Sequence, residues 1–248
     1  TLHLALGITA FLAFGLFAFQ HGYYWDDWAF AWTREHLGFE GLVNQFSANR
    51  PICAYWEGAL SFLGASPANW QIYTLLARWA ASVAFLWVLN LLWAEKRTQN
   101  ALAAFFFLLY PGFTQQNLAI TYQFFWTLHT IYFISLALML SALQKPRFRI
   151  LKLTTSMLLT AYTLFGLEYF FGLELTRILF IWIALTTIYA NPKERLQKAF
   201  RFYIPYLATL LSYLYWRIFL YKDTIYTAQD QVNISIKGIW TQLWDAIP

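Results

Sequence analysis

Long runs of apolar residues, separated by short polar loops, make up most of the chain. These runs occupy residues 2–20, 70–93, 101–113, 118–143, 153–190 and 204–221. A helix needs about twenty apolar residues to cross a bilayer, so 101–113 is a thin span and 153–190 holds two short ones. Glycines near 166–172 favour a turn between those two. The pattern predicts an all-α, polytopic membrane protein with about seven transmembrane helices, since long apolar runs satisfy their own backbone hydrogen bonds as helices.

A polar and aromatic segment of nearly fifty residues, 21–69, interrupts this pattern after the first run. Within it, residues 54–63 are apolar but too short to cross a membrane, which indicates an interfacial helix. The chain begins at Thr1, and residues 2–20 lack a small-residue cleavage site. We therefore expect a retained first span in a piece of a longer protein.

Positive charge is concentrated in three short loops. Ten of the 17 lysines and arginines lie at 95–100, 145–152 and 191–201, which fall on one side of the membrane in the seven-span arrangement. Cytoplasmic loops are enriched in lysine and arginine. This places the N-terminus in the cytoplasm and 21–69 outside, as a first extracytoplasmic loop. Residues 1–221 then form one transmembrane module, and 222–248 an extracytoplasmic segment that leads toward an absent C-terminal part.

Composition agrees with a membrane location. The chain is 60% hydrophobic and 12% charged, whereas about a quarter of the residues in a soluble domain are charged. Its single cysteine, Cys53, excludes an internal disulfide and a cysteine-based metal site. The net charge of +5 sits in loops between spans, so the expected partner is the lipid bilayer and not nucleic acid. The plasma (inner) membrane is the expected location.

Two adjacent acids, Asp26 and Asp27, lie in the aromatic sequence His-Gly-Tyr-Tyr-Trp-Asp-Asp-Trp directly after the first run. Charges near hydrocarbon are costly unless they are hydrated, paired or used. One aspartate could act as a general base, with the other orienting it or binding a divalent cation. Asp26 is the preferred base. The alternative is a hydrated acid pair between aromatic anchors.

Three further charged residues are candidate ligands for an anionic substrate. Arg50, in Asn-Arg-Pro, lies on the outer side and has the planar fork of donors that recognises phosphate; a headgroup contact is the simpler role. Glu168 lies near the outer turn of 166–172. Arg78 is a lone cation within a span, so it needs an acidic partner or an anionic ligand, and Glu168 or the aspartates could supply the acid. The prediction is that all five side chains line one outer cavity.

Other polar residues within the spans have simpler explanations. Glu174 and Arg177 have i, i+3 spacing, which predicts a structural ion pair on one helix face. His129, in the middle of the fourth span, could ligate a pigment or haem. A hydrogen bond to a neighbouring helix is the commoner role of such a histidine.

Several of these segments together resemble the GT-C superfamily of polytopic glycosyltransferases. The acidic pair in 23–28 and Asn-Arg-Pro at 49–51 resemble the O-antigen glucosyltransferase-like branch. Gly-Ala-Ser-Pro at 64–67, followed by Arg78, is similar to the protein mannosyltransferase and aminoarabinose transferase branch, as are Tyr-Pro-Gly-Phe at 110–113 and Leu-Glu-Tyr at 167–169.

The resemblance covers roughly residues 1–175, and this chain departs from the family pattern at two places. Leu167 replaces a lysine that is expected before Glu168. Gln115 and Gln116 stand where an acid often occurs after the third span. The resemblance implies an enzyme that transfers a sugar from a polyprenyl-phosphate carrier to an extracytoplasmic acceptor. It also implies that an aspartate of the 26–27 pair activates the acceptor.

Two alternatives belong to other classes. The chain could be a non-catalytic accessory subunit of a larger, pigment-bearing membrane complex, with a glycosyltransferase-like scaffold and partner membrane subunits. Such a subunit would have a large apolar face and a cofactor at His129. A transporter is less favoured, because the sequence has no internal repeat and no pair of glycine- or proline-broken spans.

Overall fold

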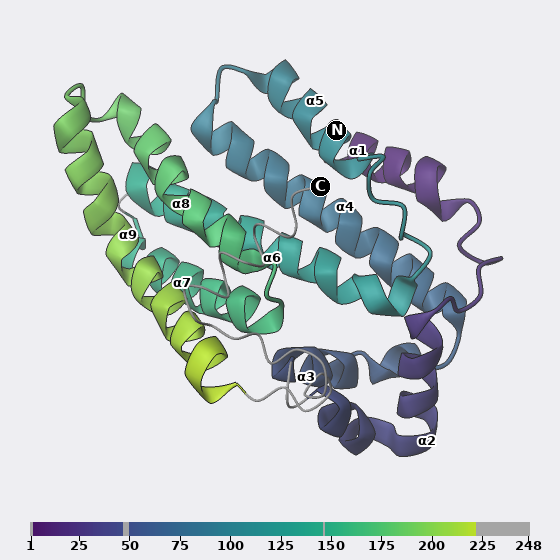
Figure 1. The fold of residues 1–248 in the computed structure, drawn as a ribbon. Coiled ribbons are helices and arrows are strands. Elements are labelled where there is room, and N and C mark those ends of the chain that lie inside the picture. Colours follow the sequence, from purple (N-terminus) through teal and green to yellow (C-terminus); the bar gives the residue numbers. More distant parts are fainter. Residues whose placement is uncertain (1, 47–49, 146, 222–248) are drawn as a thin grey trace, which may run out of the picture.

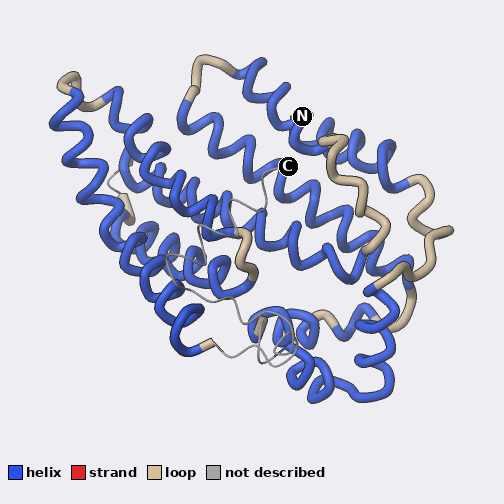
Figure 2. The backbone as a smooth tube through the Cα atoms, viewed as in Figure 1, coloured by secondary structure: helices blue, strands red, loops and turns tan. Residues whose placement is uncertain are grey.

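The computed structural model describes residues 2–46, 50–145 and 147–221, and this part of the chain contains helices and turns but no strand (Figures 1 and 2). The predicted 222–248 segment lies outside the described residues. The helices are α1 (Leu2–Ala10), α2 (Asp26–Phe46), α3 (Pro51–Ala59), α4 (Pro67–Leu92), α5 (Arg97–Leu108), α6 (Ala119–Gln144), α7 (Arg149–Gly166), α8 (Phe170–Ala184) and α9 (Pro192–Tyr215). The all-α prediction is confirmed.

Two long helices, α4 and α6, form the centre of the molecule and pack extensively against each other (Figure 1). On one side, α1 and α5 pack on α4. On the other, α7 packs on α6, and α9 packs on α7 and α8. The largest core cluster joins α6, α8 and α9 around Leu136, Phe170 and Tyr206. Burial of these apolar side chains holds the bundle together.

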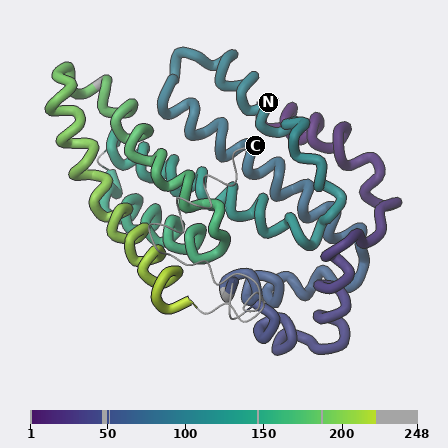
Figure 3. The backbone as a smooth tube through the Cα atoms, in the orientation of Figure 1, coloured from purple at the N-terminus to yellow at the C-terminus, as the bar shows by residue number. Residues whose placement is uncertain are grey.

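Helices α2 and α3 pack on each other at one end of the bundle, where α2 contacts α6 and α3 contacts α7 (Figure 3). The chain enters α2 through Trp25, whose left-handed backbone (φ 45°) is costly for a bulky residue. Within α2, Gly38 has φ 63° and ψ −156°, which breaks the helix into two arms. Glycine has no Cβ and adopts this conformation without a steric penalty. The first arm of α2 contacts α6, where Asp27 bonds to Thr121.

Only α4 and α6, among the described helices, are long and apolar enough to cross a membrane. Each has 26 residues. By contrast, α5 has 12 residues, which is about 18 Å of helix against a hydrocarbon core about 30 Å thick. The predicted number of about seven transmembrane helices is therefore not confirmed. The apolar runs were counted along the sequence, but several belong to shorter helices that pack on the central pair.

The loops follow the predicted arrangement. The turn predicted within 166–172 is confirmed, since α7 ends at Gly166 and α8 begins at Phe170. The end of α6 and the loops that follow α4 and α8 lie at the same end of the bundle, toward the left in Figure 1. There, Gln144 of α6 donates to the carbonyl oxygen of Leu91 of α4 (2.6 Å), and Arg149 lies 5.1 Å from the ring of Phe202. The α5–α6 and α7–α8 connections lie at the opposite end, beside α2 and α3.

Candidate active site at the end of the bundle

Asp27, in the first turn of α2, is buried against the beginning of α6. Its Oδ1 accepts hydrogen bonds from the backbone N–H (2.9 Å) and the hydroxyl (2.8 Å) of Thr121. Thr121 lies in the first turn of α6, where backbone N–H groups have no partner within the helix. Asp27 therefore caps α6 from a different element. Its Oδ2 is buried and has no hydrogen-bond partner among the described residues.

The two aspartates have different surroundings. Asp26 is exposed, whereas Asp27 is fully buried. Burial raises the pKa of the Asp27 carboxyl, and the bonds from Thr121 oppose that rise. The pair shares no hydrogen-bond partner among the described contacts, and a divalent cation held by both carboxylates stays a prediction.

A second buried acid, Glu57 of α3, faces the same turn of α6. Its Oε1 accepts a hydrogen bond of 2.5 Å from the side-chain amide of Gln123. The side-chain oxygen of Gln123, Oε1, accepts a hydrogen bond from the Trp56 indole N–H (3.0 Å), which fixes the orientation of the Gln123 amide. Glu57 Oε2 is buried without a partner. Burial raises the pKa of the Glu57 carboxyl to about 8, so this group exchanges its proton near neutral pH.

Arg34, on α2, supplies positive charge to the same region. Its two terminal nitrogens are buried and have no hydrogen-bond partner in the described structure. The guanidinium lies 4.4 Å from the centre of the Trp70 ring. Its charge lowers the pKa of Glu57, while Asp27 raises it. Asp27, Arg34 and Glu57 are therefore electrostatically coupled, and we call them the acid–arginine cluster.

Arg50 and Glu168 are brought together from positions 118 residues apart. Arg50 Nη2 donates to Glu168 Oε1 (2.7 Å), and Arg50 Nε donates to Oε2 (3.4 Å). About a third of each side chain is exposed. Burial alone would raise the pKa of the Glu168 carboxyl, but the bond from Arg50 holds it below the ordinary value. The pair joins the start of α3 to the α7–α8 turn.

Arg78 does not contact any of the acids that the sequence suggested for it. Its Nε donates to the carbonyl oxygen of Leu108, the last residue of α5, and its Nη1 donates to Gln116 Oε1, both at 2.8 Å. Because α5 is short, the 109–118 connection carries backbone carbonyls that need donors. Two other polar residues of α4 donate to the end of this connection and to the first residue of α6. Gln71 donates to the carbonyl oxygen of Asn117, and Thr74 to that of Ala119.

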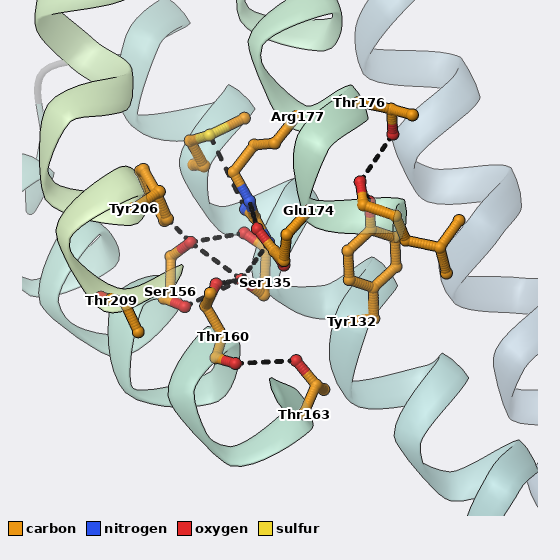
Figure 4. Close-up of polar contacts among 12 residues, drawn as sticks. Tyr132, Ser135, Ser156, Thr160, Thr163, Glu174, Thr176, Arg177, Tyr206 and Thr209 are labelled. Atoms are coloured by element: carbon orange, nitrogen blue, oxygen red, sulfur yellow. Dashed lines mark hydrogen bonds and ion pairs between the residues drawn. The ribbon is translucent and has the colours of Figure 1, made fainter. Parts of the chain in front are cut away.

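The predicted Glu174–Arg177 ion pair is confirmed, and further polar side chains of the bundle surround it (Figure 4). Arg177 donates through Nε to Oε2 (2.6 Å) and through Nη2 to Oε1 (2.7 Å) of Glu174. Nη2 also donates to the Ser135 hydroxyl, which is bonded to Ser156 and Thr160. Both charged side chains are buried. This network is a structural clamp between α6, α7 and α8.

The simpler interpretation, a hydrogen bond from His129 to a neighbouring helix, is not observed among the described contacts, because the imidazole bonds within its own helix, α6. Its Nδ1 lies 2.9 Å from the carbonyl oxygen of Phe125, four residues earlier. The imidazole is surrounded by aromatic rings, of which Phe125 (4.2 Å) and Phe170 (5.0 Å) are the nearest. A pigment or haem at His129 stays a prediction.

The structure thus divides the five predicted site residues among four places. Arg50 and Glu168 contact each other, Asp27 belongs to the acid–arginine cluster, and Arg78 lies on the middle of α4, while Asp26 is exposed. The gathering of all five around one cavity is not observed in the described contacts. Glu57 and Arg34 were missed. The signal for Glu57 was a single acid inside the apolar run 54–63.

Comparison with known proteins adds no relative: no family model, curated protein or solved structure matches the chain.

Proposed function

We propose that the protein is a membrane glycosyltransferase that moves a sugar from a polyprenyl-phosphate carrier to an extracytoplasmic acceptor. The observation that carries the proposal is the acid–arginine cluster. Asp27 Oδ2 and Glu57 Oε2 are buried acceptors without a donor, and Arg34 offers two buried nitrogens without an acceptor. Sugar hydroxyls both donate and accept hydrogen bonds, so they can satisfy both kinds of group at once.

Each residue of the cluster has a distinct role in this proposal. Glu57 takes the proton of the acceptor hydroxyl, because a base works best when its pKa lies near the working pH and that of Glu57 is about 8. Asp27 is held by Thr121 and orients the hydroxyl. Arg34 binds the sugar or the developing negative charge of the leaving phosphate. Asp26, being exposed, is not the base in this scheme.

Arg50 and Glu168 supply a second contact for the carrier. The pair is partly exposed, so Arg50 can exchange Glu168 for a phosphate without a large desolvation penalty. Its location beside α3 puts it at the same end of the bundle as the acid–arginine cluster. In the full proposal, about seven helices lie in the membrane, the basic loops are cytoplasmic, and this end is extracytoplasmic.

A transfer assay tests the proposal. The purified protein is reconstituted in liposomes with radiolabelled polyprenyl-phosphate glucose or mannose and an envelope extract as the source of acceptors. The expected result is transfer of label into the acceptor fraction, reduced about 100-fold or more by Glu57→Gln and by Asp27→Asn, given the usual contribution of a general base.

The matched control is Glu35→Gln. Glu35 is an exposed acid on α2, so this change removes the same charge from the same helix without touching the cluster. Transfer by the control at the wild-type rate is expected. Wild-type rates in both Glu57→Gln and Asp27→Asn contradict the assignment of the site. The absence of transfer by the wild type with either donor contradicts the proposed reaction for these sugars.

A further inference from the structure

Three buried hydrogen-bond donors near the middle of α4 have no acceptor. They are Arg78 Nη2, Gln116 Nε2 and Trp126 Nε1, and none has a partner among the described residues. All three side chains are more than nine-tenths buried. Buried donors without a partner are rare, because each loses its bond to water on folding. Three of them in one place indicate a missing acceptor.

Arg78 contacts both of the other donor residues, Gln116 and Trp126. Arg78 Nη1 donates to Gln116 Oε1 (2.8 Å), so the amide nitrogen of Gln116 lies beside the guanidinium. The Arg78 Cζ lies 4.7 Å from the centre of the Trp126 ring. The Arg78 side chain is fully buried, and the contacts described for it are a carbonyl, an amide and aromatic rings, with no carboxylate. A buried positive charge without a counter-charge is costly.

These features specify the chemistry of the missing group. A ligand for these residues has to accept hydrogen bonds, and it has to be negative to compensate the arginine. A phosphate group meets both requirements, since its oxygens are strong acceptors for a guanidinium. A sugar or a neutral alcohol meets only the first.

An aromatic cavity of about 620 Å³ is lined in part by Trp126, one of the three donor residues. Two of its walls, Phe113 and Trp126, also flank the guanidinium of Arg78, at 5.3 and 4.7 Å from Cζ. Phe106, Phe107 and Phe125 form much of the remaining lining. A cavity of this kind favours an apolar ligand body. Charge and cavity together therefore fit an amphiphile with a phosphate head and an apolar chain.

We propose that Arg78, Gln116 and Trp126 bind the phosphate head of a lipid whose chain occupies the adjoining aromatic cavity. The site is distinct from the acid–arginine cluster, and the proposal does not rest on the proposed transferase activity. The ligand completes a set of donors that the protein itself leaves open, and it ties the 109–118 connection to α4 and α6.

Binding of dodecyl phosphate to the purified protein in a neutral maltoside detergent tests this proposal. Native mass spectrometry and the shift in melting temperature are the two readouts. The expected result is one bound dodecyl phosphate and a rise in melting temperature, with neither effect from dodecanol. Inorganic phosphate alone is the second arm. If it binds as tightly as dodecyl phosphate, the chain does not contribute and the lipid assignment is overturned.

Gln116→Glu is the decisive variant. Its carboxylate supplies an internal partner for Arg78, so we expect dodecyl phosphate to bind at least tenfold more weakly and the ligand-free melting temperature to rise. Gln115→Glu is the matched control, because it adds the same charge one residue away on an exposed side chain. Equal binding by these two variants overturns the proposal.

Trp126→Phe provides a test that does not add charge. It keeps an aromatic ring at the wall of the cavity and removes a single donor. We expect several-fold weaker binding of dodecyl phosphate with no loss of the folded state. Unchanged binding in Trp126→Phe, or no binding of dodecyl phosphate by the wild type, also contradicts the proposed site.

Discussion

Arg177 and Arg78 are both fully buried in the helical bundle, but they differ in how their positive charges are compensated. Arg177 has a bidentate carboxylate partner in Glu174 and a hydroxyl from Ser135. Arg78 has a carbonyl, one amide and three aromatic rings, and one of its nitrogens has no partner among the described residues. The first charge is compensated within the protein, and the second is not.

The difference separates structural charges from charges available to a ligand. An arginine whose donors are all used within the protein has none available for a ligand, and removing it destabilises the fold. An arginine held mainly by neutral groups keeps its affinity for anions. The same distinction applies to the acids, since Glu57 and Asp27 each keep one buried oxygen without a donor.

Removing the two arginines is the strongest test of this comparison. Arg177→Met leaves Glu174 buried without a counter-charge, and we expect it to reduce the free energy of unfolding by about 3–5 kcal/mol. Arg78→Met removes an uncompensated charge and loses two hydrogen bonds, so a loss of less than about 2 kcal/mol is expected. Unfolding in mixed detergent micelles measures both. Equal losses of unfolding free energy in the two variants contradict the distinction between a charge that is compensated within the protein and one that is not.

The pH dependence of stability tests Glu57. Its pKa is raised from 4.5 in the unfolded chain to about 8 in the folded protein. Between these values the folded state keeps a proton that the unfolded state has released, so the contribution of Glu57 to stability is fully present below pH 4.5 and is lost as pH rises toward 8. The slope expected from Glu57 is about 1.4 kcal/mol per pH unit.

Glu57→Gln serves as the comparison for that slope. It carries no titrating group at this position, so its stability is expected to change less between pH 5 and pH 8 than that of the wild type. Urea or detergent titrations at several pH values measure the two slopes. Identical slopes in both proteins show that the pKa of Glu57 does not change on folding as proposed.

Two substitutions of Asp27 have smaller and unequal expected effects. Asp27→Ala removes both bonds to Thr121 and leaves the first turn of α6 uncapped, which costs about 1–3 kcal/mol. Asp27→Asn keeps an acceptor oxygen for Thr121, so less than about 1 kcal/mol is expected. Thermal unfolding distinguishes the two variants. A large loss in both indicates that the charge of Asp27, and not its hydrogen bonds, stabilises the fold.

The exposed pair Arg50–Glu168 is expected to contribute least. About a third of each side chain is exposed to solvent, and pairs of this kind stabilise a fold by about 0–1 kcal/mol. Glu168→Gln therefore has little expected effect on unfolding, while it frees Arg50 for an anion. A loss comparable to that of Arg177→Met contradicts a ligand-binding role for Arg50.

The sequence predicted the helical class, the turn between α7 and α8, and the Glu174–Arg177 pair, because these depend on spacing along the chain. It did not predict which arginine meets Glu168. Spacing indicates the depth of a residue but not how far its helix rotates about its own axis, and packing decides that rotation. Glu57 was missed for a related reason, since its partner Gln123 lies on α6, 66 residues away.

The hydrogen bonds from Gln71, Thr74 and Arg78 to the backbone of 108–119 have a consequence for sequence variation. Every residue type carries a carbonyl oxygen, so substitutions in the connection preserve all three acceptors. The three donor side chains have to lie on the same face of α4. A single residue inserted between positions 74 and 78 rotates the following part of the helix by about 100° and moves Arg78 off that face. Homologues are therefore expected to tolerate replacements within the connection far better than insertions or deletions in this part of α4.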